Sequence, residues 1–202
     1  MRRFLQISFL VVLATSCASY PEHNNFQTVE TKEEIYNPFF SDLEQDYIYK
    51  ASITVYDRHF GGVLVIKKIA AQHHRLVFTT EMGNKIFDFS IIKDEFVVNQ
   101  ILDDLNKGLL IKILKQDFKA LTTEHLESLQ GFSKEGQIIK MGKLDGKSHY
   151  YFEDPTLNKI VRAKHRKEKV TFLFTNINDN IAKDIDIIHA NFQLEIKLKA
   201  IF

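Results

Sequence analysis

Residues 75–91 read RLVFTTEMGNKIFDFSI, and this stretch decides the fold class. Its two arms, 75–80 and 85–91, are rich in β-branched and aromatic residues, which favour strands. The EMGN sequence at 81–84 combines glycine with asparagine, which is typical of a tight turn. A connection this short leaves no room for a crossover helix, so the two strands must pair antiparallel.

Similar segments flank this hairpin on both sides. Residues 47–55 alternate apolar and polar side chains with a period of two, and residues 63–69 repeat the pattern. Residues 95–101 form a further apolar segment after a short turn. Strands that follow one another so closely are neighbours in an antiparallel sheet, because a parallel pair needs a much longer connection.

Helical spacing replaces the strand pattern between residues 103 and 121, where the apolar side chains share one face. Shorter helices are expected at 38–45, which Asn37 would cap, and at 123–129. Strands return after residue 131, and the candidates are 137–144, 147–153, 159–163, 169–174 and the alternating segment 192–202. This order of strands, helix and strands predicts an α+β fold, a curved antiparallel sheet with helices gathered on one face.

The composition indicates one globular domain without a global electrostatic partner. Apolar residues make up 45% of the 202 residues, which is enough for a sizeable core. Without Arg2 and Arg3, which belong to the expected export signal, the 27 basic residues fall to 25 against 26 acidic ones. Such a balance argues against a nucleic-acid partner.

The first seventeen residues have the parts of a bacterial lipoprotein signal. Arg2 and Arg3 precede a short apolar run at 4–14, and small residues lead to Cys17 in the sequence ATSC. A lone cysteine in an exported chain has no internal disulfide partner, so acylation explains it better than an ordinary signal peptide cut nearby. We therefore expect Cys17 to be lipidated, with cleavage by an ordinary signal peptidase as the alternative.

These features predict three parts in the chain. Residues 1–16 are the lipoprotein signal peptide, and 17–36 are the lipidated cysteine with a polar, flexible tether. Residues 37–202 form a single β domain. The lipid anchor would hold this domain on a membrane.

No constellation of side chains points to catalysis, and we expect neither an enzyme nor a metal or other cofactor. The eight histidines are scattered, and the one adjacent pair, His73-His74, would point to opposite faces of a strand. Asp103 and Asp104 suit the start of a helix better than a catalytic pair. Recognised nucleophile, zinc and phosphate-loop motifs do not occur in the sequence.

A basic cluster occupies residues 162–169, where a hairpin turn is expected. It contains Arg162, Lys164, His165, Arg166, Lys167 and Lys169. A solvated turn explains such a cluster, and contact with anionic lipid head groups is the functional alternative.

Bulky apolar residues on the expected strands and helix exceed what an ordinary small sheet needs. A curved sheet that carries them on its concave face can enclose a cavity for a hydrophobic ligand, while a fully packed core is the alternative. The candidate lining residues are Leu76, Phe78, Phe87, Phe89, Leu110, Leu114, Phe152, Phe172 and Phe174.

Two stretches of the chain resemble the LolB branch of the LolA/LolB lipoprotein-carrier family. The segment 74–83, continued by the alternating strand through Phe89, is similar to the third and fourth strands of that branch. The ending, with IDI at 185–187 and LEIKLK at 194–199, is similar to its last two strands. The lipid anchor and the order of elements agree with the family as well.

The resemblance implies an unclosed β-barrel with helices covering the concave face, and a cavity for the acyl chains of lipoproteins. It also implies a monomer on the periplasmic face of the outer membrane that receives lipoproteins from a LolA-like periplasmic carrier. The turn with Met82 and Gly83 would touch the membrane, although a single exposed methionine needs no such explanation. The alternative function is a structural or assembly lipoprotein that binds another protein of the cell envelope.

Overall fold

The computed structural model describes residues 19–31 and 33–201. The predicted signal peptide and the predicted acylation site Cys17 lie outside the described residues. The elements in chain order are α2 (Tyr20–His23), β1 (Gln27–Val29), β2 (Ile35–Tyr36), β3 (Asp46–Val55), β4 (Arg58–Ala70), β5 (His73–Thr79), β6 (Lys85–Ile92), β7 (Glu95–Ile101), α3 (Gly108–Thr122), β8 (His125–Leu126), β9 (Gln130–Lys134), β10 (Gln137–Leu144), β11 (Lys147–Glu153), β12 (Leu157–Lys164), β13 (Lys167–Asn178), β14 (Ile181–His189) and β15 (Leu194–Ala200).

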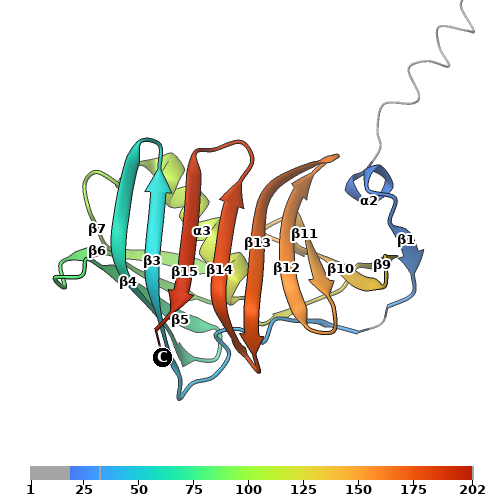
Figure 1. Cartoon of the computed structure of the whole chain (residues 1–202), viewed down its shortest axis with the longest axis horizontal. Coiled ribbons are helices and arrows are strands. Elements are labelled where there is room, and N and C mark those ends of the chain that lie inside the picture. Colours follow the sequence, from blue (N-terminus) through green and yellow to red (C-terminus); the bar gives the residue numbers. More distant parts are fainter. Residues whose placement is uncertain (1–18, 32, 202) are drawn as a thin grey trace, which may run out of the picture.

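Thirteen of these strands form one antiparallel sheet that curves strongly (Figure 1). Its order is β1-β9-β10-β11-β12-β13-β14-β15-β3-β4-β5-β6-β7. Most neighbours are joined by short hairpin turns, as the alternating segments predict. The sheet does not close, because β1 and β7 stand at its two ends without pairing to each other.

Two meanders make up this sheet, and one long-range strand pair joins them. β15 is the last strand in sequence, and it pairs antiparallel with β3, the first long strand. The register runs from Leu194 opposite Val55 to Ala200 opposite Tyr49. This pair therefore brings β9–β14 and β4–β7 into one continuous surface.

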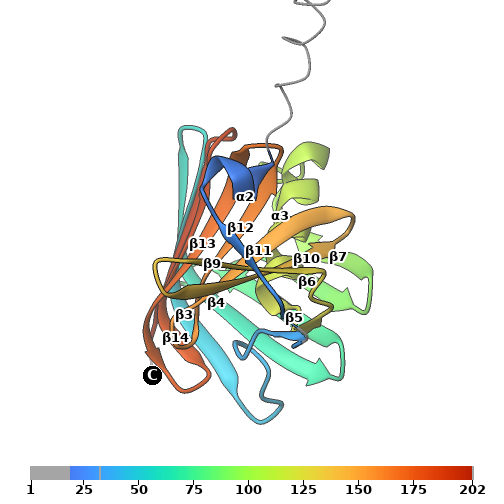
Figure 2. The same cartoon turned by 90° about the vertical axis from the view of Figure 1, so that its right-hand side faces the viewer.

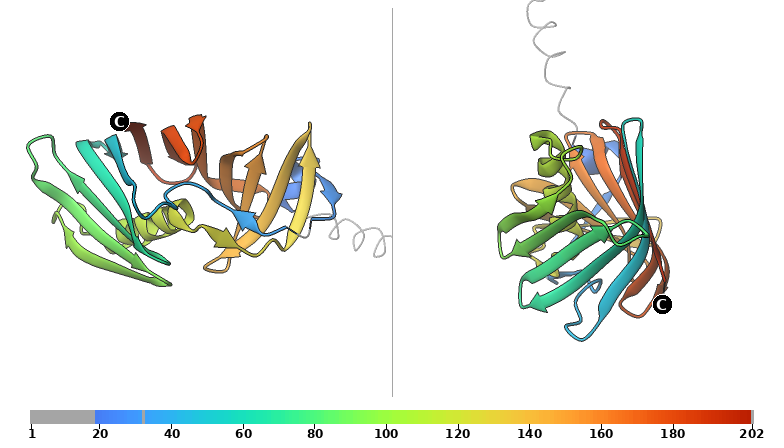
Figure 3. Two further views of the ribbon diagram at one scale, coloured as in Figure 1. Left: turned by 90° about the horizontal axis from the view of Figure 1, so that it is seen from below. Right: turned by 90° about the vertical axis from the view of Figure 1, so that its left-hand side faces the viewer.

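The helix α3 lies in the concave side of the sheet, as the two side views show (Figures 2 and 3). Its apolar side chains Leu110, Leu114, Phe118 and Leu121 are buried against the sheet. The helix begins at Gly108 and not at the predicted residue 103. The preceding residues form tight turns instead, in which the carbonyl of Leu102 accepts the backbone N–H groups of the next turn.

The predicted fold class is confirmed: the chain forms a curved, unclosed antiparallel sheet with α3 on its concave face. The second described helix, α2, packs against the opposite face, where Tyr20 joins an apolar cluster with Phe132, Tyr150 and Phe152. The cluster is aromatic at its centre, since the rings of Tyr20 and Tyr150 lie 4.7 Å apart.

The prediction of a flexible tether is wrong for most of the described part of residues 17–36. Tyr20 and Pro21 are buried, and β1 extends the sheet by pairing with β9. β2 pairs with β8 in a small separate sheet. The segment is polar on average, but it contains a few aromatic side chains that pack on the sheet, namely the buried Tyr20 and the partly buried Phe26.

The two predicted short helices are also wrong. Residues 38–45 form turns, in which Phe39 and Phe40 are buried in the core and Phe40 has a φ of 63°. Asn37 does accept the N–H of Phe39, but its side chain also donates to the carbonyl of Leu121 at the end of α3. The segment 123–129 contains β8, because pairing with β2 satisfies its backbone.

The two adjacent glycines of β4 provide a test of how tightly the sheet is built. A Cβ on Gly62 would lie 1.9 Å from the carbonyl oxygen of Thr79, whereas one on Gly61 would meet only the side chain of His59 at 3.6 Å. We expect Gly62→Ala to lower the free energy of unfolding by about 2 kcal/mol, because β4 and β5 must separate locally. Gly61→Ala is the matched control and should change it by no more than about 0.5 kcal/mol. Urea unfolding measures both; equal midpoints for the two variants would contradict the observed β4–β5 approach.

Candidate ligand-binding interface between the helix and the sheet

The predicted cavity-lining side chains lie where the curved sheet meets α3, with one exception. Eight of the nine belong to a single buried cluster that fills the concave side, and they are Leu76, Phe78, Phe87, Phe89, Leu110, Leu114, Phe172 and Phe174. Phe152 is the exception: it is buried on the opposite face, in the cluster with Tyr20. Alternation explains this, because Tyr151, its neighbour on β11, takes the concave position.

The apolar side chains of this interface are packed against one another in the described conformation. The rings of Phe87 and Phe89 stack with centroids 4.4 Å apart, and Phe118 of α3 contacts both at 5.7 and 6.2 Å. Phe78 lies 5.3 Å from Phe87. The concave side therefore holds a packed aromatic core, and any hydrocarbon chain would have to take the place of these rings or displace α3.

A polar island interrupts this apolar interface near the middle of α3. The carboxylate of Asp117 is completely buried, and its oxygens lie 2.9 Å from His189 Nε2 and 3.4 Å from an Arg162 nitrogen. Arg162 comes from β12 and His189 from the end of β14, so the three side chains join the helix to two strands. We call Asp117, Arg162 and His189 the buried triad.

The buried triad is close enough for ion pairing but poorly aligned for hydrogen bonding. Within the described residues, both oxygens of Asp117, Nη1 of Arg162 and Nε2 of His189 have no hydrogen-bond partner. The imidazole of His189 donates from Nδ1 to the carbonyl of Leu194. Its Nε2 faces the carboxylate of Asp117 at 2.9 Å from the other side of the ring.

Two more polar groups lie beside the triad on the same face. His149 is the direct cross-strand neighbour of Arg162, and its Nδ1 donates to the carbonyl of Lys147. Burial lowers the pKa of His149 to about 4, so the side chain is neutral at pH 7 and its Nε2 is a free acceptor. The hydroxyl of Tyr151 is likewise buried without a partner among the described residues, and burial raises its pKa.

A hollow of about 640 Å³ opens at the C-terminal end of α3. Its charges are paired: Lys119 Nζ contacts Asp145 at 2.7 Å, and Lys68 Nζ contacts Glu124 at 2.8 Å. His74 is buried here, with Nε2 2.9 Å from the carbonyl oxygen of Phe40. Burial lowers its pKa. Because its charges already satisfy one another, this hollow is a structural network and a weak candidate for a ligand.

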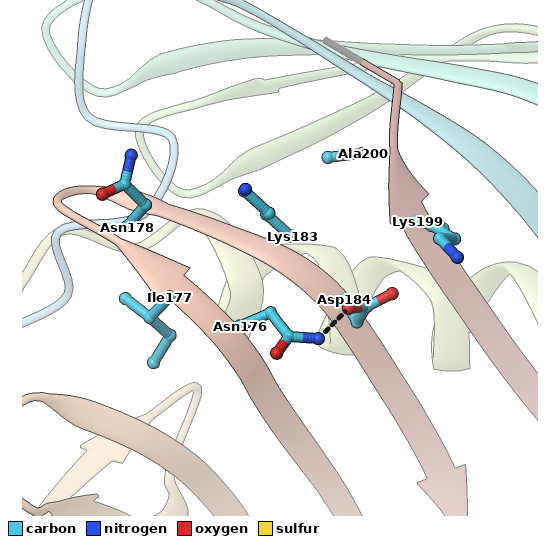
Figure 4. Close-up of a pocket in the computed structure, with 7 residues that line it drawn as sticks. All are labelled: Asn176, Ile177, Asn178, Lys183, Asp184, Lys199 and Ala200. Carbon is cyan, nitrogen blue, oxygen red and sulfur yellow. Dashed lines mark hydrogen bonds between the residues drawn. The ribbon is translucent and has the colours of Figure 1, made fainter.

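A second hollow lies at the turn between β13 and β14 (Figure 4). It is polar, and the amide of Asn176 donates to the carboxylate of Asp184 across it at 2.6 Å. Lys183 and Lys199 border the same hollow. The arrangement holds the turn together and offers no side-chain pair suited to proton transfer.

The predicted membrane-contact turn lies at one end of the molecule. It connects β5 to β6 at the left of Figure 1, whereas α2 lies at the right end. Met82 is 92% exposed, and Gly83 has a φ of +83°, which favours glycine. Met82 is thus a solvent-exposed apolar side chain at a hairpin tip.

Metal and membrane-span features are absent from residues 19–31 and 33–201. That part of the chain has no cluster of His, Cys, Asp and Glu able to hold a metal ion. It also has no helix long and apolar enough to cross a membrane.

No family model matches the sequence, and no curated protein matches it. Among solved structures, the chain is similar to a LolA superfamily protein from Nitrosomonas europaea, with 6% identity and a TM-score of 0.47 over 82% of this chain and 88% of that one. It is also similar to a DUF1329 family protein from Desulfovibrio piger, with 8% identity and a TM-score of 0.42 over 78% and 84%. At these values the chain is assigned to neither family.

The lowered pKa of His149 predicts how stability responds to acid. The unfolded side chain has a pKa near 6.5. Between about pH 6.5 and pH 4 this imidazole is therefore protonated in the unfolded chain and neutral in the folded chain. The contribution of this group to the free energy of unfolding is fully present above about pH 6.5, and it is lost as the pH falls toward 4. We expect wild type to lose about 2 kcal/mol between pH 7 and 4.5 from this group, and His149→Leu to lack that loss.

Urea unfolding at both pH values measures this difference. His59→Gln, on the exposed part of β4, is the matched control and should keep the wild-type pH dependence. An unchanged slope in His149→Leu would show that the imidazole is not buried in the neutral form.

Proposed function

We propose that this protein is a lipid-anchored lipoprotein of the outer membrane that binds acyl chains or accepts lipoproteins at the periplasmic face. The ligand's hydrocarbon would enter between α3 and the concave face of the sheet. Cys17 would carry the anchor, and a LolA-like periplasmic carrier would supply lipoprotein cargo. The protein would act as a monomer and not as an enzyme.

The observation that carries this proposal is the buried triad in an otherwise apolar interface. Each buried polar atom that lacks a hydrogen-bond partner costs the closed form about 1–3 kcal/mol. Movement of α3 away from β12 and β14 would expose these atoms to water or to a ligand. The triad therefore lowers the free energy needed to separate helix and sheet, while the surrounding phenylalanines offer an apolar surface once they part.

The open shape of the sheet supports the same proposal. Because β1 and β7 remain unpaired with each other, the concave side can widen without breaking a strand ladder. The helix α3 is attached through loops at both ends and lies against the sheet through its side chains. Helix movement would thus cost apolar contacts but leave the sheet intact.

The exposed Met82 would give the protein a contact with the bilayer during delivery. An apolar side chain at the tip of a hairpin is free to enter a lipid surface, and Gly83 keeps the turn compact. Burial of a methionine side chain there would add to the binding provided by the anchor.

A double substitution tests the role of the triad. In Asp117→Leu/Arg162→Met two apolar side chains replace the buried charged pair, so we expect equal or greater stability and at least tenfold weaker binding of a fluorescent long-chain fatty acid. The control is Asp104→Leu/Arg58→Met, which makes the same changes in an exposed ion pair at 2.6 Å and should bind like wild type. All proteins carry Cys17→Ser so that the anchor does not compete.

Lipid extraction with mass spectrometry accompanies this titration. Recovery of a bound acyl lipid from the Cys17→Ser protein supports the proposal. Failure to bind the fatty acid, together with failure to recover any lipid, would overturn it. If the double variant binds as well as wild type, the triad has no part in opening.

Membrane anchoring is tested separately with the single cysteine. We expect wild type in the membrane fraction, labelled by radioactive palmitate, and Cys17→Ser unlabelled and without the acyl anchor. Cys17→Ala is a second variant, since it too removes the thiol. Equal labelling of wild type and both variants would exclude acylation at this position.

The outer edge of β7 favours a second candidate function, that of a structural or assembly lipoprotein. β7 is an end strand of the sheet, and Val97 and Val98 on it are exposed. An added strand from another envelope protein could pair with this edge. Crosslinking from β7 that recovers one stoichiometric partner, with no acyl binding, would favour this function over the first.

A further inference from the structure

A basic hollow lies at the opposite face from α3, beside the first described residues. It measures about 800 Å³ and lies between α2 and the turn that joins β12 to β13. Its lining includes Ser19, Tyr20, Ser148, Tyr150 and Ala163. The remaining lining residues are Lys164, His165, Arg166, Lys167 and Lys169.

The positive charges of this hollow are uncompensated in the described part of the chain. No carboxylate lies within ion-pair distance of Lys164, Arg166, Lys167 or Lys169 there. The nearest acid in sequence, Glu168, accepts instead from the hydroxyl of Tyr20 at 2.6 Å. The hollow therefore has a net positive charge, in a protein whose overall charge is close to balance.

The backbone places two of these charges in direct opposition. Lys164 and Lys167 are partners across the β12–β13 ladder, at the pair that closes the hairpin. Like charges at such a pair repel each other. The turn between them is tight, with His165 at a φ of 56°, so the two lysines are held close to each other. An anion between them would relieve the repulsion.

The location of the hollow indicates which anion it would meet. Ser19, in its lining, follows Cys17 by two residues, so an acylated Cys17 would bring the hollow to the bilayer surface. The turns β3–β4 and β14–β15 lie along the same upper rim of the sheet (Figure 1). On these turns Tyr56 is exposed and its ring lies 5.2 Å from that of Phe192, an aromatic pair suited to the head-group region.

We propose that this basic hollow binds the anionic phosphate head group of membrane phospholipids and turns the upper rim of the domain toward the bilayer. The basic side chains would contact the phosphate, and Tyr150 and Tyr20 would lie beside it. The inference rests on the anchoring part of the proposed function, and it is independent of acyl-chain binding beneath α3. The two sites lie on opposite faces of the sheet, so each can be removed alone.

Vesicle flotation tests the proposal with the full chain carrying Cys17→Ser. The vesicles are either pure phosphatidylcholine or phosphatidylcholine with 30% phosphatidylglycerol, at about 0.1 M salt. We expect about tenfold or greater preference for the anionic vesicles, which Lys164→Gln/Arg166→Gln/Lys167→Gln abolishes. Raising the salt to about 0.5 M should also abolish the preference.

A matched variant controls for the loss of three charges. Lys50→Gln/Lys197→Gln/Lys199→Gln removes three exposed lysines from β3 and β15, away from the hollow, and should keep the preference. Equal loss in both triple variants would mean that net charge alone drives the binding, and this would overturn the site. Equal binding to both kinds of vesicle would overturn it as well.

Two further measurements separate the remaining explanations. Titration with inorganic phosphate distinguishes a free anion from a head group: binding of phosphate without preference for anionic vesicles would overturn the membrane assignment. Fatty-acid binding should be the same in both triple variants and wild type. If no protein binds the fatty acid but the preference for anionic vesicles remains, the result supports the head-group site and contradicts the acyl-binding function.

Discussion

The pairing of β15 with β3 is the contact on which the rest of this structure depends. It joins strands from opposite ends of the chain, with Ile196 opposite Ile53 at its centre. Ordering the chain between them loses conformational entropy, which the burial of both strands in the core must offset. Without this pair, two separate meanders would remain. The continuous concave face against which α3 packs therefore depends on it.

The concave and opposite faces of the sheet have different chemistry, although the same strands form both. On the concave side, apolar rings pack against α3, and a few buried polar atoms lack hydrogen-bond partners. On the opposite side, a smaller aromatic cluster ends in an exposed basic hollow next to Ser19. Strand alternation produces this separation, because neighbouring residues on β11 and β12 point in opposite directions. A hydrocarbon chain and an anionic head group would therefore meet the molecule on different surfaces.

Charge pairs in this protein fall into two kinds that differ in alignment. Asp88 is held by Arg75 through two hydrogen bonds of 3.0 and 2.8 Å and also by Lys85, which keeps the pKa of that carboxyl well below its usual range. Asp117 is buried more completely, yet it meets its partners at poor angles. The first arrangement stabilises the β5–β6–β7 end of the sheet. The second leaves the helix–sheet interface with unsatisfied polar groups, and buried ion pairs of this kind contribute little to stability.

The sequence by itself determined the local elements, because alternation and turn chemistry act over a few residues. The predicted strands 137–144 and 147–153 coincide with β10 and β11, and the hairpin at 75–91 appears as β5 and β6. It also placed eight of the nine apolar candidates on the face that packs against α3. Only the tertiary structure decided which strands pair over long distances, that the segment around Tyr20 and β1 belongs to the domain, and that Asp117 meets Arg162 and His189. Those contacts join residues that are far apart in the chain, so the local periodicity of the sequence cannot predict them. Each of them depends on the burial that the complete sheet provides.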